Sequence, residues 1–244
     1  MKDSYYDVMR HWLLIDGKPT KDFGVYLSGN GTFKAAEKNL EEFTIPGRNG
    51  TFHYKSDTYK NVKIPYDCFI YKNFRNNIAA FRSFLLSRKG YVRIEDTHHP
   101  DEFRMGIYHD EFDPEVFVDL SAGQFTINFD CKPERWLKIG EKSITFLYSG
   151  AINNPTYFTS KPIIRCYGSG GTVTIGGISV SVTDVTDYVD IDSEELEVHK
   201  GDDYTFNSKS TLTNGKFPTL SPGLTSVSFS GFTKIDITPR WWFL

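Results

Sequence analysis

Side chains that could do chemistry are numerous in this sequence, but few are spaced as in a known site. The pair His98-His99 precedes Pro100-Asp101, and histidines beside an acid could begin a metal site. A zinc site requires three or four converging ligands, and no recognisable spacing nearby supplies the remaining ones. The pattern therefore favours a solvated loop over a metal centre.

A second concentration of candidate ligands is acidic and surrounds Ser193. Its members are Asp190, Asp192, Glu194, Glu195 and Glu197. Calcium prefers oxygen ligands, but this segment lacks the glycine and the terminal glutamate of a known calcium loop. We expect a solvated turn that caps a strand, and no metal or cofactor is predicted for this chain.

Catalytic motifs are also missing from the sequence. It contains no GxSxG elbow, no HExxH pair and no P-loop. The chain has 31 acidic residues and six scattered histidines, so a catalytic pair cannot be selected by spacing. No catalytic residue is predicted, and a hydrolase with an unrecognised carboxylate pair stays open as an alternative.

The three cysteines, Cys68, Cys131 and Cys166, are far apart in the sequence and lie in strand-like runs. Without a CxxC pair they are expected to be small buried hydrophobic residues, as in a protein made in a reducing cytosol.

Aromatic residues supply a different alternative, a carbohydrate-binding module used in host-surface adhesion. Trp241, Trp242 and Tyr188 could stack on sugars. Adjacent residues of a strand point to opposite faces, so at most one of the two tryptophans faces inward. We expect one buried anchor and one surface or interface residue.

Composition limits the class of protein. The 244 residues are 16% aromatic and carry a net charge of −3, which excludes a disordered chain and gives no electrostatic reason to expect nucleic acid binding. No run of 18 apolar residues is present, so no membrane span is predicted.

The elements that must position these residues are mainly strands, with one helix. Apolar residues recur at Phe74, Ile78, Phe81 and Leu85, which places them on one face of a helix at about 73–89. Asn73 is the expected cap, and Gly90 is expected to end the helix. Strand runs flank Pro46-Gly47-Arg48-Asn49-Gly50, in which Asn-Gly is the commonest dipeptide of a type I′ turn.

The amino-acid composition changes near residue 140, so we expect one domain over 1–139 and a second over 140–244. The second is rich in Ser, Thr and Gly and shows short strands of a sandwich or jelly roll. Gly176-Gly177 predicts a two-residue hairpin. A turn at Gly231 is expected to separate strands at 224–229 and 234–238.

The order of several motifs resembles the distal tail proteins of bacteriophages with long non-contractile tails that infect Gram-positive hosts. The first part carries Phe23-Gly24-Val25 and then Ile45-Pro46-Gly47-Arg48-Asn49-Gly50-Thr51, similar to the family's IPGRDG-like turn, with Asn49 where Asp is common. The single helix and the glycine after it follow in the family's order. The second part carries Ile191-Asp192-Ser193-Glu194, and the chain ends on Pro239-Arg240-Trp241-Trp242-Phe243-Leu244.

The motif positions taken from the resemblance are structural ones. They are Pro46, Gly47, Arg48, Asn49, Gly50, Asp192, Ser193, Glu194, Pro239 and Trp241.

The resemblance implies an N-terminal β-sandwich with one helix and a C-terminal galectin-like β-sandwich. It implies a structural hub of the tail tip, built as a homohexameric ring that can stack on a second ring. Its partners would be the tail tube protein, the tail-associated fibre or lysin protein and a receptor-binding protein. The protein would be made in the host cytoplasm, reside in the virion tail tip, and perform no catalysis.

Overall fold

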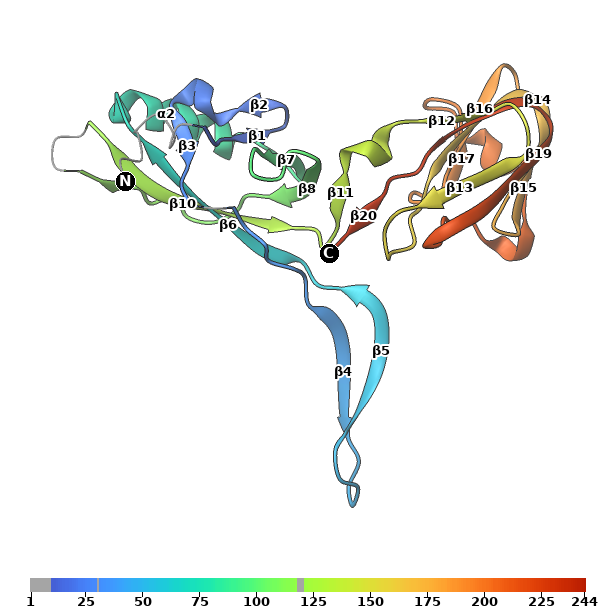
Figure 1. Ribbon diagram of the computed structural model, residues 1–244, viewed down its shortest axis with the longest axis horizontal. Helices are drawn as coiled ribbons and strands as arrows, with labels where there is room; N and C mark the ends of the chain where they lie inside the picture. Colours follow the sequence, from blue (N-terminus) through green and yellow to red (C-terminus); the bar gives the residue numbers. More distant parts are fainter. Residues whose placement is uncertain (1–9, 30, 118–120) are drawn as a thin grey trace. The chain divides into compact units, whose positions relative to one another are not determined.

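The computed structural model describes residues 10–29, 31–117 and 121–244, which form two compact units (Figure 1). Unit 1 ends at Arg135 and also includes Leu244, and unit 2 comprises Trp136–Phe243. Among the described residues, no helix is long and apolar enough to cross a membrane.

The main sheet of unit 1 is antiparallel, with strand order β2-β1-β7-β8-β10-β6-β3. Its strands are β1 (Leu13–Ile15), β2 (Lys18–Pro19), β3 (Val25–Leu27), β6 (Val62–Ile70), β7 (Val92–Asp96), β8 (Glu102–Ile107) and β10 (Gly123–Cys131). The short β9 (Glu115–Val116) pairs with β10, and the 3-10 helix η1 (Thr20–Phe23) precedes β3. A separate two-stranded sheet contains β4 (Lys38–Thr44) and β5 (Thr51–Tyr59).

Strict alternation in β6 and β10 builds the core of unit 1. These two strands pair over nine residues each, and every second side chain, such as Ile64 and Ile127, is fully buried. The helix α2 (Phe74–Leu86) adds Phe74, Phe81 and Leu85 to this core, with Ile78 partly buried beside them. The helical face predicted from the spacing is therefore confirmed.

The ends of α2 differ from the prediction. Asn73 has left-handed backbone angles, with φ 52°, and its side chain makes no capping hydrogen bond; its carbonyl instead accepts from the amides of Asn76 and Asn77. The helix ends at Leu86 rather than after Lys89. The Ser87 amide still donates to the Ser83 carbonyl four residues back, whereas the Arg88 amide donates to the Leu85 carbonyl only three residues back. Gly90, with φ 66°, lies in the connection to β7.

Unit 2 is organised around two long antiparallel strands, β14 (Ile163–Ile175) and β19 (Gly223–Thr238). The first half of β14 pairs with the second half of β19, and the second half of β14 with the first half of β19. Each of these two paired regions has its own group of neighbouring strands. One group contains β12 (Ile144–Phe146), β16 (Tyr188–Asp192) and β17 (Glu197–His199), and the other contains β13 (Gly150–Asn154), β15 (Ile178–Val182) and β18 (Ser210–Leu212). The alternate side chains of both groups meet in one core around Ile164, Val173, Ile235 and Ile237.

The predicted turn at Gly231 is wrong, because β19 runs through this position as one strand. The register of β14 against β19 shifts between Tyr167 and Thr172, where both strands bend. A Cβ on Gly171 would lie 2.2 Å from the carbonyl oxygen of Ser230, so glycine is required by the close approach of the two backbones. The predicted Gly176-Gly177 hairpin is confirmed, since Ile175 pairs directly with Ile178.

The remaining elements of unit 2 are short. They are η2 (Lys138–Glu141), η3 (Thr205–Asn207), η4 (Thr213–Gly215) and the strand β20 (Trp242–Phe243), which pairs with β11 (Arg135–Leu137).

Candidate assembly surfaces

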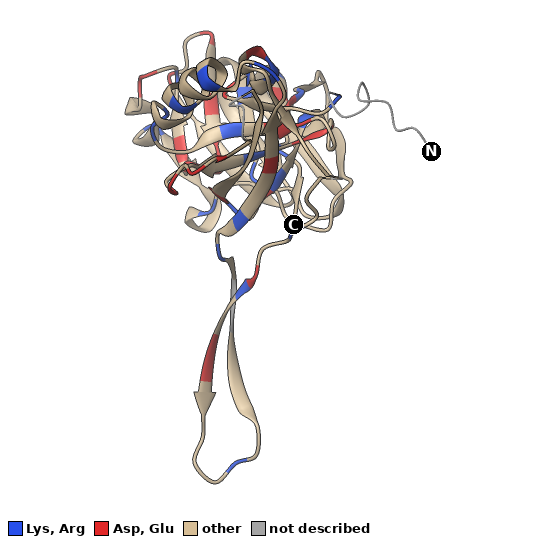
Figure 2. Cartoon of the chain, turned by 90° about the vertical axis from the view of Figure 1, so that its left-hand side faces the viewer, with Lys and Arg blue, Asp and Glu red and all other residues tan. Residues whose placement is uncertain are grey.

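The β4–β5 hairpin, called the arm from here on (residues 38–59), is the most exposed element of unit 1. Its strands pair antiparallel, with Phe43 opposite Phe52 and Glu41 opposite Tyr54. Figure 2 shows it as a long two-stranded extension. Most of its described side chains are exposed, so the arm contributes almost nothing to the core of its own unit.

Large apolar side chains along the arm are about half exposed to solvent. They are Leu40, Phe43, Ile45, Phe52 and Tyr54, with exposed fractions of 42–61%. By the register, Phe43, Phe52 and Tyr54 share one face of the hairpin. Exposed apolar side chains gathered in this way favour a protein–protein contact, and unpaired strand edges add main-chain groups that another chain can pair with. The arm is therefore the strongest candidate for an assembly surface among the described residues.

The predicted turn Pro46–Gly50 forms the tip of the arm, and all five residues are exposed. It is not a two-residue type I′ turn, because that turn needs positive φ at both central positions and Asn49 does not have it. The connection instead has positive φ at Gly47 (79°) and Gly50 (86°), and the Arg48 amide donates to the Ile45 carbonyl. Arg48 is the one charged residue of the tip.

The motif residues of unit 2 converge on one ion pair at the end of β16. Asp192 accepts two hydrogen bonds from the Arg240 guanidinium, at 2.7 and 2.8 Å, and further bonds from the amides of Glu194 and Glu195. Burial alone would raise the pKa of Asp192, but these hydrogen bonds and the charge of Arg240 outweigh it and hold the pKa below its ordinary value.

The neighbouring motif positions are also structural. The Ser193 amide donates to the Pro162 carbonyl, and Glu194 forms an exposed ion pair with Lys161 at 3.2 Å. The Pro239 carbonyl accepts from the buried Ser160 hydroxyl at 2.7 Å. Trp241 is buried against Gly140. These motif positions therefore join the end of the chain to β16 and η2.

Arg240 was not selected from the sequence, although it stands inside the C-terminal motif. The residues around Asp192 have the sequence pattern of a buried strand. A carboxylate buried in such a strand requires a cationic partner, and this requirement is the signal that could have led to Arg240. The expectation of a solvated acidic turn is wrong for Asp190 and Asp192. Both are buried, and Asp190 is held by Arg165 through two hydrogen bonds of 2.8 Å.

The aromatic residues proposed for sugar stacking have other contacts. Trp241 is buried, as expected for one of the pair. Trp242 stacks on Phe158, with ring centroids 4.5 Å apart, and its indole N–H donates to the Thr159 carbonyl. The ring of Tyr188 has the Arg165 guanidinium 4.4 Å from its centroid. No open tryptophan platform is present among the described residues.

The histidine pair lies in the turn between β7 and β8, as expected for a loop, but both side chains are half-buried rather than solvated. His98 stacks on His11 with centroids 3.8 Å apart, and burial together with that neighbour lowers the pKa of His98. His99 contacts the Asp96 carboxylate through Nδ1 at 2.9 Å. No group of three His, Cys, Asp or Glu within the described ranges could hold a metal ion.

The cysteines are buried and unpaired, which confirms the expectation of small core residues. Burial raises the pKa of Cys68 and Cys166 far above the ordinary thiol value and that of Cys131 to about 12, so none is poised as a thiolate.

Comparison with known proteins gives the first unit a family. The family model of the phage tail protein RIFT-related domain matches residues 20–131, which cover nearly all of the main sheet, the arm and α2. Residues 20–131 are thus similar to a phage tail protein domain, and the resemblance to phage tail proteins is confirmed. No curated protein matches the chain.

Solved structures extend the likeness to both units. The SPP1 Dit protein, described as a paradigm of the hub adsorption apparatus in phages infecting Gram-positive bacteria, has a TM-score of 0.75 at 16% identity, over 96% of this chain and 99% of that one. A chain of the phage P2 baseplate in its activated conformation with calcium has a TM-score of 0.53 at 10% identity, over 94% and 98%. At these identities the likeness establishes the fold, which is mainly β as predicted.

Proposed function

We propose that this chain is the distal tail hub of a phage, assembling as a ring that connects the tail tube to the fibre or lysin protein at the tip. The observation that carries the proposal is the agreement of fold over 96% of this chain with a hub protein of a phage adsorption apparatus. The phage tail domain in residues 20–131 supports the same role.

The arm supports assembly into a ring on physical grounds. An exposed apolar hairpin on one side of a subunit needs a different, receiving surface on its neighbour, and such head-to-tail contacts close into a ring when their rotation allows it. The resemblance to distal tail proteins supports six copies, the tail tube, fibre or lysin and receptor-binding proteins as partners, and residence in the virion after assembly in the host cytoplasm. We propose a non-enzymatic role because the related proteins are structural.

The ring is tested by mass measurement in solution and negative-stain microscopy of the full chain. We expect a closed ring with a central hole for the wild type. Replacing two apolar residues of the arm, Phe43→Ser with Phe52→Ser, should shift the population to monomer with an unchanged circular dichroism spectrum.

The matched control is Tyr148→Ser with Tyr157→Ser, which removes two exposed aromatic side chains of unit 2, 83% and 93% exposed, without touching the arm. The control should still form rings. A monomeric wild type at tens of micromolar, or rings that survive the arm substitutions unchanged, would contradict the proposal. Saturable binding of monomeric chain to host cell-wall glycans would instead favour the carbohydrate-binding alternative.

A further inference from the structure

The segment that enters the arm, called the arm root from here on (residues 31–34), lies against the β7–β8 connection and β8. The Lys34 carbonyl accepts a hydrogen bond of 3.1 Å from Arg104 Nη2. The Phe33 ring meets the His99 ring edge-on, with centroids 5.1 Å apart. A Cβ on Gly31 would lie 3.0 Å from His98 Cβ and from His99 Cε1, so the backbone passes close to both histidines.

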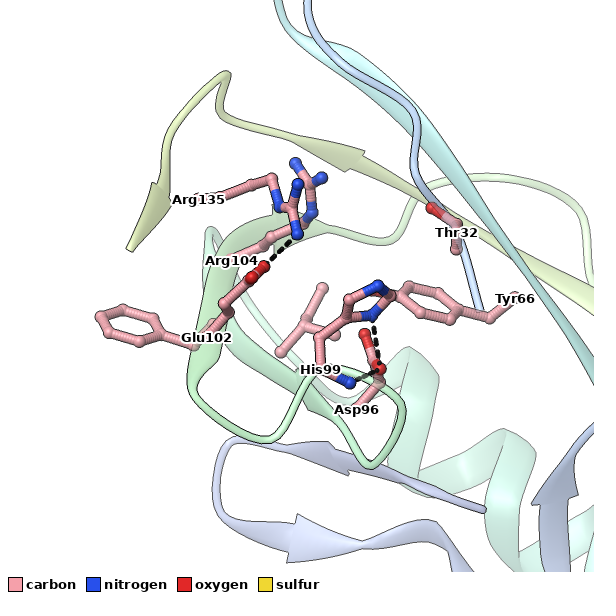
Figure 3. A pocket seen from close by; sticks show the side chains of 9 residues that line it. Thr32, Tyr66, Asp96, His99, Glu102, Arg104 and Arg135 are labelled. Atoms are coloured by element: carbon pink, nitrogen blue, oxygen red, sulfur yellow. Dashed lines mark hydrogen bonds and ion pairs between the residues drawn. The ribbon is translucent and has the colours of Figure 1, made fainter. Parts of the chain in front are cut away.

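A small polar cavity lies beneath this contact (Figure 3). Its volume is about 10 Å³, which is the room that a single water molecule needs. The side chains of Thr32 from the arm root, His99 from the turn and Arg104 from β8 all line it, together with those of Asp96 and Glu102. Figure 3 shows these side chains around one common space.

Three atoms of these side chains are buried and have no hydrogen-bond partner among the described residues. They are Thr32 Oγ1, His99 Nε2 and Arg104 Nη1. Arg104 is 7% exposed, so its free N–H group cannot turn to bulk solvent. A buried polar atom left unsatisfied is destabilising, and three such atoms on one cavity indicate a shared partner.

The chemistry of the three atoms selects that partner. Asp96 Oδ1 can only accept, so His99 Nδ1 donates to it, and Nε2 of the neutral ring is left as an acceptor. Arg104 Nη1 can only donate, and the Thr32 hydroxyl can do either. With the His99 ring neutral, the partner must therefore accept from Arg104 and donate to His99 at the same time.

Water meets this requirement, whereas a halide can only accept and would face the lone pair of His99 Nε2. The charges around the cavity also balance, because Arg104 and Arg135 are offset by Asp96 and Glu102, with Arg135 and Glu102 ion-paired. A neutral ligand therefore fits better than an anion.

We propose that this cavity binds one water molecule, which accepts from Arg104, donates to His99 and completes its third hydrogen bond with Thr32. The bound water joins the arm root to the body of unit 1 at a point where no direct hydrogen bond between their side chains is available. It would hold the base of the arm in place in each subunit, whether or not subunits assemble.

A crystal structure of the full chain, with a second crystal soaked in sodium bromide, tests the occupant. We expect a water-sized density peak within hydrogen-bond distance of Thr32 Oγ1, His99 Nε2 and Arg104 Nη1, without anomalous signal from bromide. An empty cavity or a bromide peak at this position would overturn the proposal.

Hydrogen exchange of the full chain tests the role of the water in solution. Thr32→Val keeps the shape of the side chain but removes the hydroxyl, and Thr32→Ser is the matched control that keeps it. The loss of one net hydrogen bond should speed exchange in peptides covering the arm root by about fivefold in Thr32→Val. Peptides of β6 should be unchanged in both variants, and equal exchange of the arm root in the Val and Ser variants would refute the role.

Discussion

At the scale of single residues, the ion pair of Asp192 and Arg240 is the contact whose loss should destabilise unit 2 most. The side chain of Asp192 is 6% exposed, so removing its cation leaves a buried charge with only backbone amides to solvate it. Arg240→Ala should lower the free energy of unfolding by about 3 kcal/mol, measured by urea denaturation at neutral pH.

The control for this prediction is Lys161→Ala, which removes the partner of Glu194 two residues further along the chain. That pair is about half exposed on both sides, so its loss should cost less than about 1 kcal/mol. The pKa of Asp192 is lowered in the folded chain, so its contribution is present above the ordinary carboxyl value and disappears as the pH falls through the folded pKa. Equal costs for both variants at neutral pH would show that burial of Asp192 does not decide the effect.

Residues of this kind also show why part of the candidate site could not be predicted from the sequence. The cysteines are predicted to be buried because they lie in strand-like runs, and one of Trp241 and Trp242 because adjacent residues of a strand point to opposite faces. Asp190 and Asp192 were expected in solvent because their acidity suggested hydration, while their partners, Arg165 and Arg240, stand 25 and 48 residues away in the sequence. Long-range pairing of charges leaves no local pattern, so such pairs become visible only in the fold.

At the scale of elements, the spacing of apolar residues along the sequence was the feature that predicted most of the secondary structure. It predicted the buried face of α2 and the strands on both sides of the arm tip. It does not distinguish a bend from a turn, so it predicts two strands where β19 runs through Gly231 as one. It also could not show that Phe43 and Phe52 are exposed, because an apolar strand in an arm has the same pattern as one in a core.

The bend in β14 and β19 makes a specific prediction. Gly171→Ala should be strongly destabilising, because the new Cβ would lie 2.2 Å from the carbonyl oxygen of Ser230 and the two backbones must separate. We expect a loss of more than about 2 kcal/mol in the free energy of unfolding, within the range of overpacking.

Gly177→Ala in the neighbouring hairpin is the matched control for the bend. Its Cβ would meet nothing within 4 Å, so that only the strain of a positive φ of 84° remains, worth about 1–2 kcal/mol. Thermal unfolding of the two variants measures the difference. If Gly171→Ala is no worse than Gly177→Ala, the close approach of the two strands at the bend is not a tight one.

At the scale of the whole molecule, the charge of the arm bears on how subunits would hold together. Residues 38–59 contain three basic residues, Lys38, Arg48 and Lys55, and three acidic ones, Glu41, Glu42 and Asp57, so the arm has no net charge with its histidine neutral. The chain as a whole carries only −3. Association through the arm should therefore depend on burial of apolar surface rather than on attraction between charged faces.

Salt separates these two kinds of association. Raising the ionic strength from about 0.1 M to about 1 M shortens the Debye length from roughly 10 Å to 3 Å and weakens contacts between exposed charges. Sulfate salts strengthen apolar burial because the ion is excluded from protein surface. Rings joined by the arm should thus persist in high sodium chloride and gain stability in ammonium sulfate, as measured by the subunit concentration at which light scattering shows half of the chains assembled. Dissociation in sodium chloride would instead show that charged groups hold the subunits together, and Phe43→Ser with Phe52→Ser would then leave the salt response of assembly unchanged.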